Sequence, residues 1–241
     1  MHVRPPEPGG LRAVTYNVHD LRDDRDATAH VLRTLRADVV CLQEVPRRLA
    51  AAGRLARLAR EVGLQVAAAG RGSGGTAVLA HPRLDVVSAR VERLPVAGAT
   101  TRTRGVAIAA LRLPDGTRVS VASVHLPLLA GERMVHARLV LHTLADVGRS
   151  PYILGGDLNE PPDGPSWAVL GEQLDDVAPG GAGTFPSSGA RRRIDALLVS
   201  GGVRVEDARV AGELDGLSEA VLARASDHLP VLADLVVQCG R

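Results

Sequence analysis

Polar side chains that can bind a metal ion or move a proton follow several short apolar runs of this sequence. Asn17 follows AVTY, Glu44 follows VVCLQ and His125 follows VASV, while Asp157 and Asn159 lie in the stretch ILGGDLN. Charged and polar groups beside buried segments are costly unless they are paired or bind a metal ion. Together, these residues therefore indicate a functional site at the ends of several strands.

Three further polar residues belong to the same pattern. Asp227 and His228 precede the last apolar run, in ASDHLP, and Asp195 lies inside RIDALLVS, where a strand would carry an apolar residue. Taken singly, most of the residues in the pattern have an ordinary explanation, such as a turn asparagine, a capping aspartate or a solvated strand end. Because six separate segments each supply an oxygen ligand or an imidazole, a shared site is the better interpretation.

The chemistry that these residue types can support is metal-assisted phosphoryl transfer. Mg²⁺ prefers oxygen ligands and keeps several waters, so one or two carboxylates are enough to hold it. Glu44 and Asp227 fit this requirement, with Asn17 as a neutral helper. We therefore predict Mg²⁺ as the cofactor, with Mn²⁺ as a possible substitute.

A second set of residues can handle the proton and the phosphate. Asp157 can orient and deprotonate an attacking water, and Asn159, two residues on along an extended backbone, can donate to a phosphate oxygen. A protonated His228 can donate to another oxygen, and Asp195 would hold its tautomer and raise its pKa. The glycine pair 155–156 is predicted to let the strand end approach the substrate closely.

The spacing of apolar residues predicts the elements that must position these side chains. Helical spacing predicts helices over 24–36, 47–63 and 132–148. Strands are predicted over 11–18, 37–45, 65–70, 75–82, 84–94, 151–159, 192–200, 204–212 and 229–237, and a hairpin over 104–127 with its turn at 114–116. This mixed order predicts an α+β layered sandwich, with a flexible leader over 1–10 and a single domain over 11–241.

Composition limits the possible functions. The 29 basic residues are all arginine, but the formal net charge is only +2, so arginine content alone does not indicate a nucleic-acid-binding protein. Few aromatic residues are present, so no base-stacking platform is evident. No apolar run is long enough for a membrane span, and the N-terminus lacks the apolar region of a signal peptide. Cys41 and Cys239 form no disulfide framework, so we expect a cytoplasmic monomer.

The segments that carry these residues are similar to a known family. TYNVHD, CLQEV, SVHLP, GGDLNEPP, RIDALLVS and SDHLPV occur in the order and approximate spacing of the endonuclease/exonuclease/phosphatase superfamily. This superfamily includes pancreatic-type DNase, abasic-site endonucleases, sphingomyelinases, inositol-polyphosphate phosphatases and deadenylases. The resemblance spans about residues 11–237 and implies a four-layer α/β/β/α sandwich of two packed mixed sheets flanked by helices.

The resemblance also implies a role for each site residue. In the family pattern Glu44 is the principal Mg²⁺ ligand, with Asn17 and Asp227 beside the metal, and Asp157 activates the nucleophilic water. Asn159 and His228 contact the scissile phosphate, and Asp195 pairs with His228. His125 resembles a residue near the leaving group, and Arg104 resembles a phosphate-contacting arginine that could equally be a solvated strand end.

Some positions depart from particular branches of the family. The DNase branch orients its leaving-group histidine with a glutamate, but region 72–80 has no carboxylate, which weakens His125 as a general acid. Abasic-site enzymes carry an acidic residue where this chain has His19, which is either a metal neighbour or a surface histidine. Phe185 and the arginines at 191–193 are similar to the deadenylase-like group, although Phe185 could equally fill the core.

These observations predict a Mg²⁺-dependent phosphoesterase that hydrolyses a phosphodiester or a phosphomonoester by in-line attack of a water activated by Asp157. A Mg²⁺-dependent nuclease acting on DNA or RNA is the alternative within the same chemistry, so nucleic acid is a possible partner. A catalytically inactive binding module on the same fold is the alternative from another class, although such proteins usually lose one or more of the residues named above.

Overall fold

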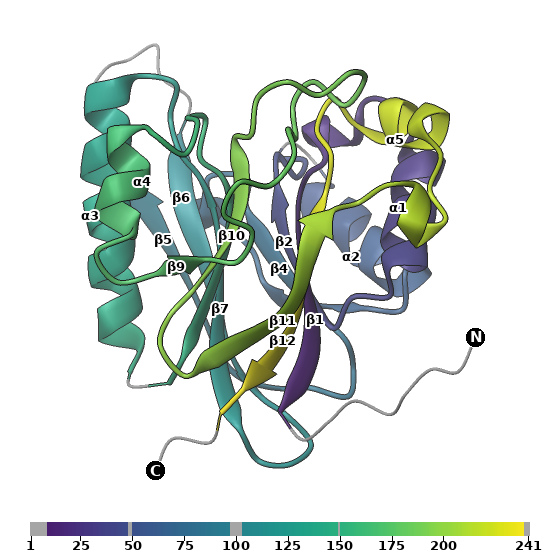
Figure 1. Cartoon of the computed structure of the whole chain (residues 1–241). Helices are drawn as coiled ribbons and strands as arrows, with labels where there is room; N and C mark the ends of the chain where they lie inside the picture. The colour runs from purple at the N-terminus through teal and green to yellow at the C-terminus, as the bar shows by residue number, and fades with distance from the viewer. Residues whose placement is uncertain (1–8, 48–49, 97–102, 149, 239–241) are drawn as a thin grey trace.

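The computed structural model describes residues 9–47, 50–96, 103–148 and 150–238, and within them the chain forms two six-stranded sheets and five α-helices. The two sheets face each other in the middle of the molecule (Figure 1). One sheet is covered by α1 (Arg25–Leu35), α2 (Ala51–Glu61) and α5 (Glu219–Ala225), and the other by α3 (Ala130–Val147) and α4 (Pro165–Leu170). The predicted four-layer α+β sandwich is therefore confirmed.

The first sheet is built from both ends of the chain. Its strands follow the order β11 (Val203–Val210), β12 (Val231–Val237), β1 (Gly10–Asn17), β2 (Val39–Gln43), β4 (Ala77–Ala80) and β3 (Gln65–Ala68). Only the central pair, β1 and β2, is parallel, and α1 supplies the crossover connection that a parallel pair requires.

The second sheet comes from the middle of the chain and repeats the same arrangement. Its order is β5 (Asp85–Leu94), β6 (Arg104–Arg112), β7 (Arg118–His125), β8 (Tyr152–Asp157), β10 (Asp195–Val199) and β9 (Asp175–Asp176). Here β7 and β8 form the parallel pair, joined through α3, and the other pairs are antiparallel. Both sheets thus have one parallel pair between antiparallel neighbours.

This topology gathers the predicted site residues at one end of the sandwich. The parallel strands β1 and β2 end side by side, with Asn17 opposite Gln43, and β7 and β8 end with His125 opposite Asp157. The antiparallel strand β10 begins at the same end, so Asp195 lies opposite Asp157. Strand β12, antiparallel to β1, likewise begins just after the segment that carries His228.

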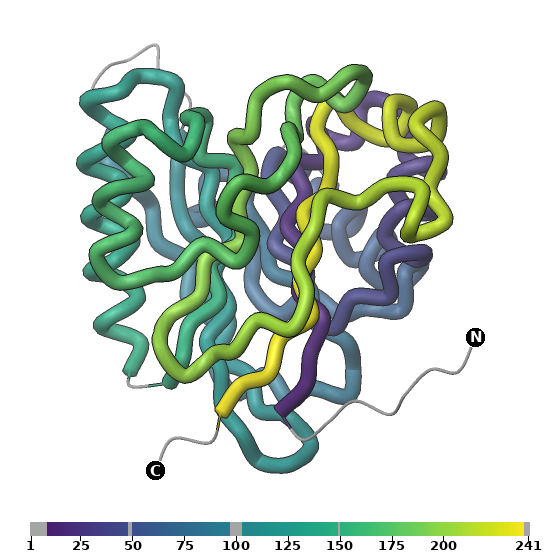
Figure 2. Tube along the Cα trace, viewed as in Figure 1, coloured from purple at the N-terminus to yellow at the C-terminus, as the bar shows by residue number. Residues whose placement is uncertain are grey.

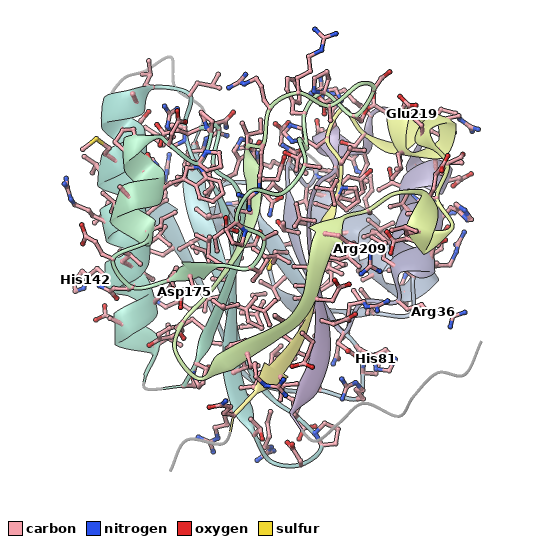
Figure 3. The ribbon with its side chains drawn as sticks, in the orientation of Figure 1. Arg36, His81, His142, Asp175, Arg209 and Glu219 are labelled. Atoms are coloured by element: carbon pink, nitrogen blue, oxygen red, sulfur yellow. The ribbon has the colours of Figure 1, made fainter. Side chains whose placement is uncertain are left out.

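Three apolar layers hold the sandwich together. Cys41 and Ile153 pack between the two sheets, Tyr16 and Leu58 pack between the first sheet and its helices, and Trp167 packs between the second sheet and its helices. Full burial of one large apolar side chain contributes about 1.5–3 kcal/mol, so these layers supply most of the driving force for folding. Polar side chains such as Arg36, His142 and Glu219 lie at the periphery of the molecule (Figure 3).

The glycine pair that precedes Asp157 has a packing role. A Cβ on Gly155 would lie 2.5 Å from the Cβ of Cys41 on the facing sheet, and one on Gly156 would lie 2.5 Å from Cγ1 of Val124 on β7. The space beside these glycines is therefore taken by the protein itself. The sequence-based expectation was that the glycines let the substrate approach the strand end. They instead let the two sheets, and the neighbouring strands β7 and β8, approach each other closely.

The sequence predicted the long elements better than the short ones. Each predicted helix overlaps one of α1, α2 and α3, and the predicted hairpin is the β6–β7 pair. The short elements α4, α5 and β9 were not predicted. Residues 1–8 of the expected leader and Cys239 lie outside the described residues, whereas Gly10 already belongs to β1. In the part of the chain that the structure describes, no helix has the length and apolar character needed to cross a membrane.

Candidate active site

Asn17 lies at the centre of a group of acidic and histidine side chains. Its amide nitrogen lies 3.0 Å from Oδ2 of Asp157, 3.5 Å from Oε1 of Glu44 and 3.5 Å from Nε2 of His228. Its Oδ1 accepts a hydrogen bond of 3.1 Å from the backbone N–H of His19, which fixes the orientation of the amide. One residue at the end of β1 therefore connects residues from both sheets.

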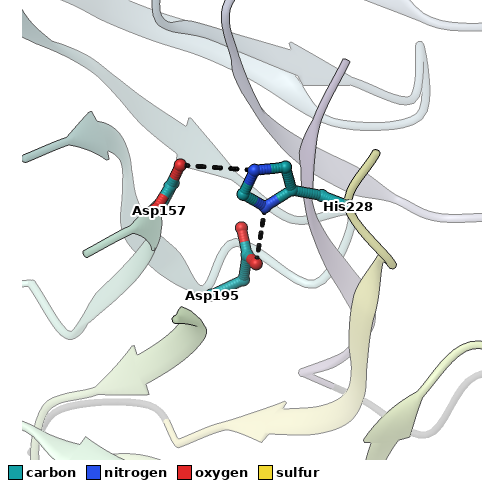
Figure 4. A group of neighbouring side chains, drawn as sticks. All are labelled: Asp157, Asp195 and His228. Atoms are coloured by element: carbon teal, nitrogen blue, oxygen red, sulfur yellow. Dashed lines mark hydrogen bonds and ion pairs between the residues drawn. The ribbon is translucent and has the colours of Figure 1, made fainter. Parts of the chain in front are cut away.

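Asp157, Asp195 and His228 form a buried triad (Figure 4), and none of the three is more than 5% exposed. His228 Nδ1 lies 2.9 Å from Oδ2 of Asp195, and His228 Nε2 lies 3.8 Å from Oδ2 of Asp157. Potential ligand atoms of the three residues all lie within 4.8 Å of one another, a spacing that could hold a metal ion. The predicted pairing of Asp195 with His228 is present in the structure.

The environment of the triad shifts two pKa values. Burial, and after it the nearby charge of Asp195, raise the pKa of Asp157 from 3.8 to about 7, against the opposing effects of His228 and of hydrogen bonds from Asn159 and Asn17. Burial by itself lowers the pKa of His228, but the charge and hydrogen bond of Asp195, with the charges of Asp157 and Asp227, outweigh it and raise that pKa from 6.5 to about 9. At neutral pH the site thus holds a protonated histidine beside a carboxyl group that readily exchanges its proton.

His125 and Asn159 contact each other directly beside Asp157. The amide nitrogen of Asn159 lies 2.9 Å from His125 Nε2 and also donates to the carbonyl oxygen of Leu126 at 2.9 Å. His125 Nε2 lies 3.4 Å from Oδ2 of Asp157, whose Oδ1 accepts from the backbone N–H of Asn159 at 2.9 Å. With the amide nitrogen as donor, His125 Nε2 accepts this hydrogen bond, so the contact joins the end of β7 to the loop after β8.

Glu44 and Asp227 lie at the more exposed side of the group. Glu44 is half-buried and has the left-handed φ of 50° that few non-glycine residues adopt. The Asp227 side chain is 41% exposed, and its Oδ1 lies 3.8 Å from Nδ1 of His19. Solvent access at these carboxylates suits Mg²⁺, which keeps several of its waters. His19 also lies 2.7 Å from Oδ2 of Asp23. Its position next to Asp227 places it at the edge of the site.

The segment between β9 and β10 runs over this end of the sandwich (Figure 2). Its backbone bonds to the segment before β12 through Leu229 N to Thr184 O at 2.8 Å and Ser187 N to Asp227 O at 2.7 Å. Phe185 is partly exposed, and its ring centroid lies 4.9 Å from that of His228. Phe185 therefore packs on the site histidine and does not fill the interior of the core.

Arg104 lies on the face of the second sheet that packs against the helices, opposite to the face that carries Asp157. Arg104 pairs with Leu94 on β5. Leu94 and Val106 belong to the apolar layer between this sheet and α3, and Arg104, two residues before Val106, lies on the same face of β6. Arg104 is 6% exposed, and its charge contributes to lowering the pKa of His136 on α3, after burial, the main cause. The structure thus places Arg104 away from the face that carries Asp157, and its contact with phosphate remains a prediction.

Gln43 is a site-supporting residue to which the sequence analysis assigned no role. Its Nε2 lies 3.1 Å from Oγ1 of Thr15 and 3.1 Å from Oγ of Ser123 on the facing sheet, and Ser123 Oγ donates to the carbonyl of Leu42 at 2.7 Å. These hydrogen bonds connect the two sheets directly below the site. The signal in the sequence was a carboxamide and a hydroxyl at inward-facing positions of otherwise apolar strands.

The donor set fits a divalent cation. Oδ1 of Asp195 is buried and has no hydrogen-bond partner among the described residues, and Asp157 lies opposite Asp195 on the neighbouring strand. Glu44 borders the group at Asn17, and the charge of Asp227 acts on His228. Buried carboxylates repel one another unless a cation or a proton compensates them. Oxygen donors with a few histidine nitrogens are what Mg²⁺ and Mn²⁺ accept.

The fold and the buried acid–histidine group together define an α+β sandwich enzyme with its site at the strand ends shared by two sheets. The model of the Endonuclease/Exonuclease/phosphatase family matches residues 14–228, so the chain belongs to that family. Members of this family are metal-dependent hydrolases of phosphate ester bonds, and the predicted enzyme class is confirmed. A search of the curated proteins found no match.

Solved structures of other proteins have the same fold. The endonuclease/exonuclease/phosphatase from Bacteroides vulgatus has 18% sequence identity and a TM-score of 0.77, covering 95% of this chain and 99% of that chain. Mannosyl-6-phosphatase from Bacteroides thetaiotaomicron has 21% identity and a TM-score of 0.75, covering 94% and 99%. TDP2 from D. rerio, complexed with a single-strand DNA product, has 19% identity and a TM-score of 0.73, covering 94% and 98%. At these identities the likeness concerns the fold.

Proposed function

We propose that the protein is a Mg²⁺-dependent phosphoesterase that hydrolyses a phosphodiester or phosphomonoester by in-line attack of water. The observation that carries the proposal is the buried contact between Asn17, Asp157 and His228, which joins the two sheets within 3.0–3.5 Å of one amide nitrogen. All the residues that the family chemistry requires are present in this chain, which argues against an inactive binding module.

Asp157 is the proposed base for the attacking water. Its pKa of about 7 lies near neutral pH, where a general base is most effective. Asn17 and the backbone N–H of Asn159 each hold one oxygen of the carboxylate, so its orientation toward the water is fixed. The proton leaves the water for an oxygen of Asp157 as the new phosphorus–oxygen bond forms, and the bond between phosphorus and the leaving-group oxygen breaks on the opposite side.

His228 is the proposed stabiliser of the charge that develops on the phosphate. Asp195 holds Nδ1 at 2.9 Å, so the remaining N–H, at Nε2, faces the same space as Asp157. With a pKa of about 9 the imidazole is protonated at neutral pH and donates a charge-assisted hydrogen bond to a phosphate oxygen. Asn159 and His125 are proposed to contact the phosphate and the leaving-group side, respectively.

Glu44 is the proposed principal ligand of Mg²⁺, with Asn17 and Asp227 beside the ion. Two ion positions are conceivable, one at Glu44 and one inside the buried triad. Glu44 is favoured because His228 Nδ1 is already bonded to Asp195 and a protonated imidazole repels a cation. A bound Mg²⁺ would neutralise charge on the phosphate, and Mn²⁺ could replace it.

The first test is hydrolysis of bis-p-nitrophenyl phosphate and p-nitrophenyl phosphate with Mg²⁺ or Mn²⁺, repeated with EDTA. We expect turnover that requires the metal and that Asp157→Asn lowers by about 10²- to 10⁴-fold, the usual contribution of a general base. Full activity of Asp157→Asn would exclude the proposed base. Absence of turnover with either metal, on these esters and on a panel of nucleic-acid, lipid and sugar phosphates, would contradict the proposed function.

A nuclease is the second candidate, because the fold is also that of a solved protein complexed with a DNA product. Contacts to many phosphates make nucleic-acid binding steeply dependent on salt. Activity on DNA or RNA that falls steeply between about 50 and 200 mM salt would favour the nuclease. A flat response together with turnover of small esters would favour a small substrate. The single domain, cytoplasmic location and monomeric state expected from the sequence remain predictions.

A further inference from the structure

Arg133 and Glu160 form a buried ion pair next to the proposed site. Arg133, in the first turns of α3, is 8% exposed, and Glu160, directly after Asn159, is 4% exposed. Nε and Nη2 of Arg133 lie 3.0 and 2.9 Å from the same oxygen, Oε1 of Glu160. The pair is removed from water and well formed, so both side chains have a fixed geometry.

The same guanidinium also binds the loop that follows His125. Nη1 of Arg133 donates to the carbonyl oxygens of Pro127 at 3.0 Å and Leu128 at 2.9 Å. A guanidinium is planar, with its donors in a rigid fork, so its contacts fix the relative positions of their acceptors. One arginine therefore connects the loop after β7 to the loop after β8.

Glu160 is held just as firmly on its other side. Its Oε2 accepts from the backbone N–H of Ser166 at 2.7 Å, and its carbonyl oxygen accepts from Nε1 of Trp167 at 2.8 Å. Gly164 lies against it so closely that a Cβ there would come within 2.1 Å of Cγ of Glu160. Glu160 thus cannot shift without moving the start of α4.

The contact that this arrangement controls is the one between His125 and Asn159. The named strand pairing of β7 with β8 ends at His125 and Asp157. Just beyond it, Leu126 N donates to the carbonyl oxygen of Asp157 at 2.9 Å, and Leu158 N donates to that of Ile194 at 2.7 Å. Asn159 has a left-handed φ of 52° and reaches back to His125 Nε2 and to the carbonyl of Leu126. Glu160 and Pro127 lie directly next to Asn159 and Leu126 in the chain, so Arg133 joins the two loops at the residues that flank this contact.

We propose that Arg133 is a positioning residue that, through Glu160 and the two loop carbonyls, holds Asn159 in contact with His125 at the reacting phosphate. The role assigned to those two residues rests on the proposed function. A buried ion pair often adds little net stability relative to apolar side chains of similar size, so stability alone gives no reason for this one. Misplacement of a catalytic group by about 1 Å can lower a rate by about 10²-fold.

The kinetic test compares Arg133→Met with Arg12→Met. Arg12 also donates two hydrogen bonds to one carboxylate, of Asp234, and one to a main-chain carbonyl, but it lies near the start of β1, at the end of the strand away from Asn17. Turnover of bis-p-nitrophenyl phosphate with Mg²⁺ is measured at a temperature where circular dichroism shows all variants folded. We expect Arg133→Met to lower kcat by about 10- to 100-fold with little change in KM, and Arg12→Met to leave kcat unchanged.

Two milder variants keep the test decisive if Arg133→Met does not fold. Glu160→Gln keeps the shape of the side chain but removes its charge, and Arg133→Lys keeps the charge but cannot reach Glu160 and both carbonyls together. Both should lower kcat by an intermediate factor. A kcat within twofold of the wild type in Arg133→Met, or in both milder variants, would overturn the proposal.

A second readout is independent of activity. Imidazole ¹H–¹⁵N spectra of labelled protein report the ring of His125, assigned with His125→Gln. We expect the His125 signals to shift in Arg133→Met and in Glu160→Gln but not in Arg12→Met. Unchanged His125 signals in the first two variants would overturn the positioning role. If the wild type hydrolyses no phosphate ester but the His125 signals still shift in Arg133→Met and Glu160→Gln, the proposed function is contradicted. The positioning role of Arg133 then still holds.

Discussion

Asp157 and Asp195 lie directly opposite each other on the antiparallel strands β8 and β10, and both are buried. Two like charges at facing positions of a sheet destabilise it unless a cation compensates them. His228 supplies this compensation, since its two ring nitrogens face the two carboxylates at 2.9 and 3.8 Å. The pKa values of Asp157 and His228 therefore depend on each other and on the charge of Asp195.

Removing the negative charge of Asp195 should lower the pKa of His228. Without that carboxylate, the charge and the hydrogen bond of Asp195 are lost while burial remains, so the pKa of His228 falls from about 9 toward its ordinary value of 6.5. At pH 7.5 a pKa of about 6.5 leaves about one imidazole in ten protonated. We expect Asp195→Asn to lower kcat at pH 7.5 by at least about tenfold, and NMR titration of His228 to show the lowered pKa. An unchanged pKa of His228 would contradict this cause.

The stability of the metal-free protein should fall as the pH rises. The pKa values of both Asp157 and His228 are raised in the folded state, so the folded protein binds more protons than the unfolded chain between about pH 4 and 9. Their contribution to the free energy of unfolding is therefore complete at low pH and is lost as the pH rises through about 7 and then about 9.

Urea unfolding in EDTA at pH 5, 7 and 9 measures this effect. We expect the free energy of unfolding of the wild type to fall progressively from pH 5 to pH 9, because both groups lose the extra protons bound in the folded state. The double variant Asp157→Asn/Asp195→Asn is the control, and its stability should depend less on pH in this range. Equal pH dependence in the two proteins would show that other groups are responsible.

Binding of Mg²⁺ should depend on Glu44. A ligand that binds only the folded state raises the unfolding temperature by mass action, so Mg²⁺ should stabilise the wild type. We expect Glu44→Gln to lose most of this thermal shift and to require a higher Mg²⁺ concentration for turnover. A full shift in Glu44→Gln together with its loss in Asp195→Asn would instead place the ion inside the buried triad.

A methyl group at Gly155 should destabilise the protein without direct contact with the substrate. The added Cβ would lie 2.5 Å from the Cβ of Cys41, so the two sheets must separate locally. Overpacking of this kind costs about 1–3 kcal/mol. We expect Gly155→Ala to lower the urea midpoint, whereas Gly131→Ala, whose Cβ would meet nothing within 4 Å, should not. Equal midpoints would mean that the sheets adjust freely.

The sequence could predict that several of the candidate residues lie close together, because they occur at the ends of apolar strands. Asn17, Asp157, Asp195 and His228 lie together as the pattern suggested. The alternation of a strand shows that residues two apart share a face. It does not show whether that face packs against the other sheet or against the helices, so the position of Arg104 was not predictable.

The contacts that support the site could not be predicted because they join residues that lie far apart in the chain. Arg133 and Glu160 lie 27 residues apart, and nothing local in the sequence marks them as partners. The helices α4 and α5 span six and seven residues, too few for an apolar period to be recognised. The packing role of Gly155 depends on Cys41 of the other sheet, a contact that only the tertiary fold creates.

The repeated arrangement of the two sheets gives the site an approximate internal two-fold layout. The paired ends Asn17 and Gln43 on β1 and β2 correspond to His125 and Asp157 on β7 and β8. One half of the molecule thus contributes amides and the neighbouring Glu44, and the other half contributes an imidazole and a carboxylate at matching positions. Matching places in the two sheets thus carry different functional groups, and the candidate site needs residues from both halves of the molecule.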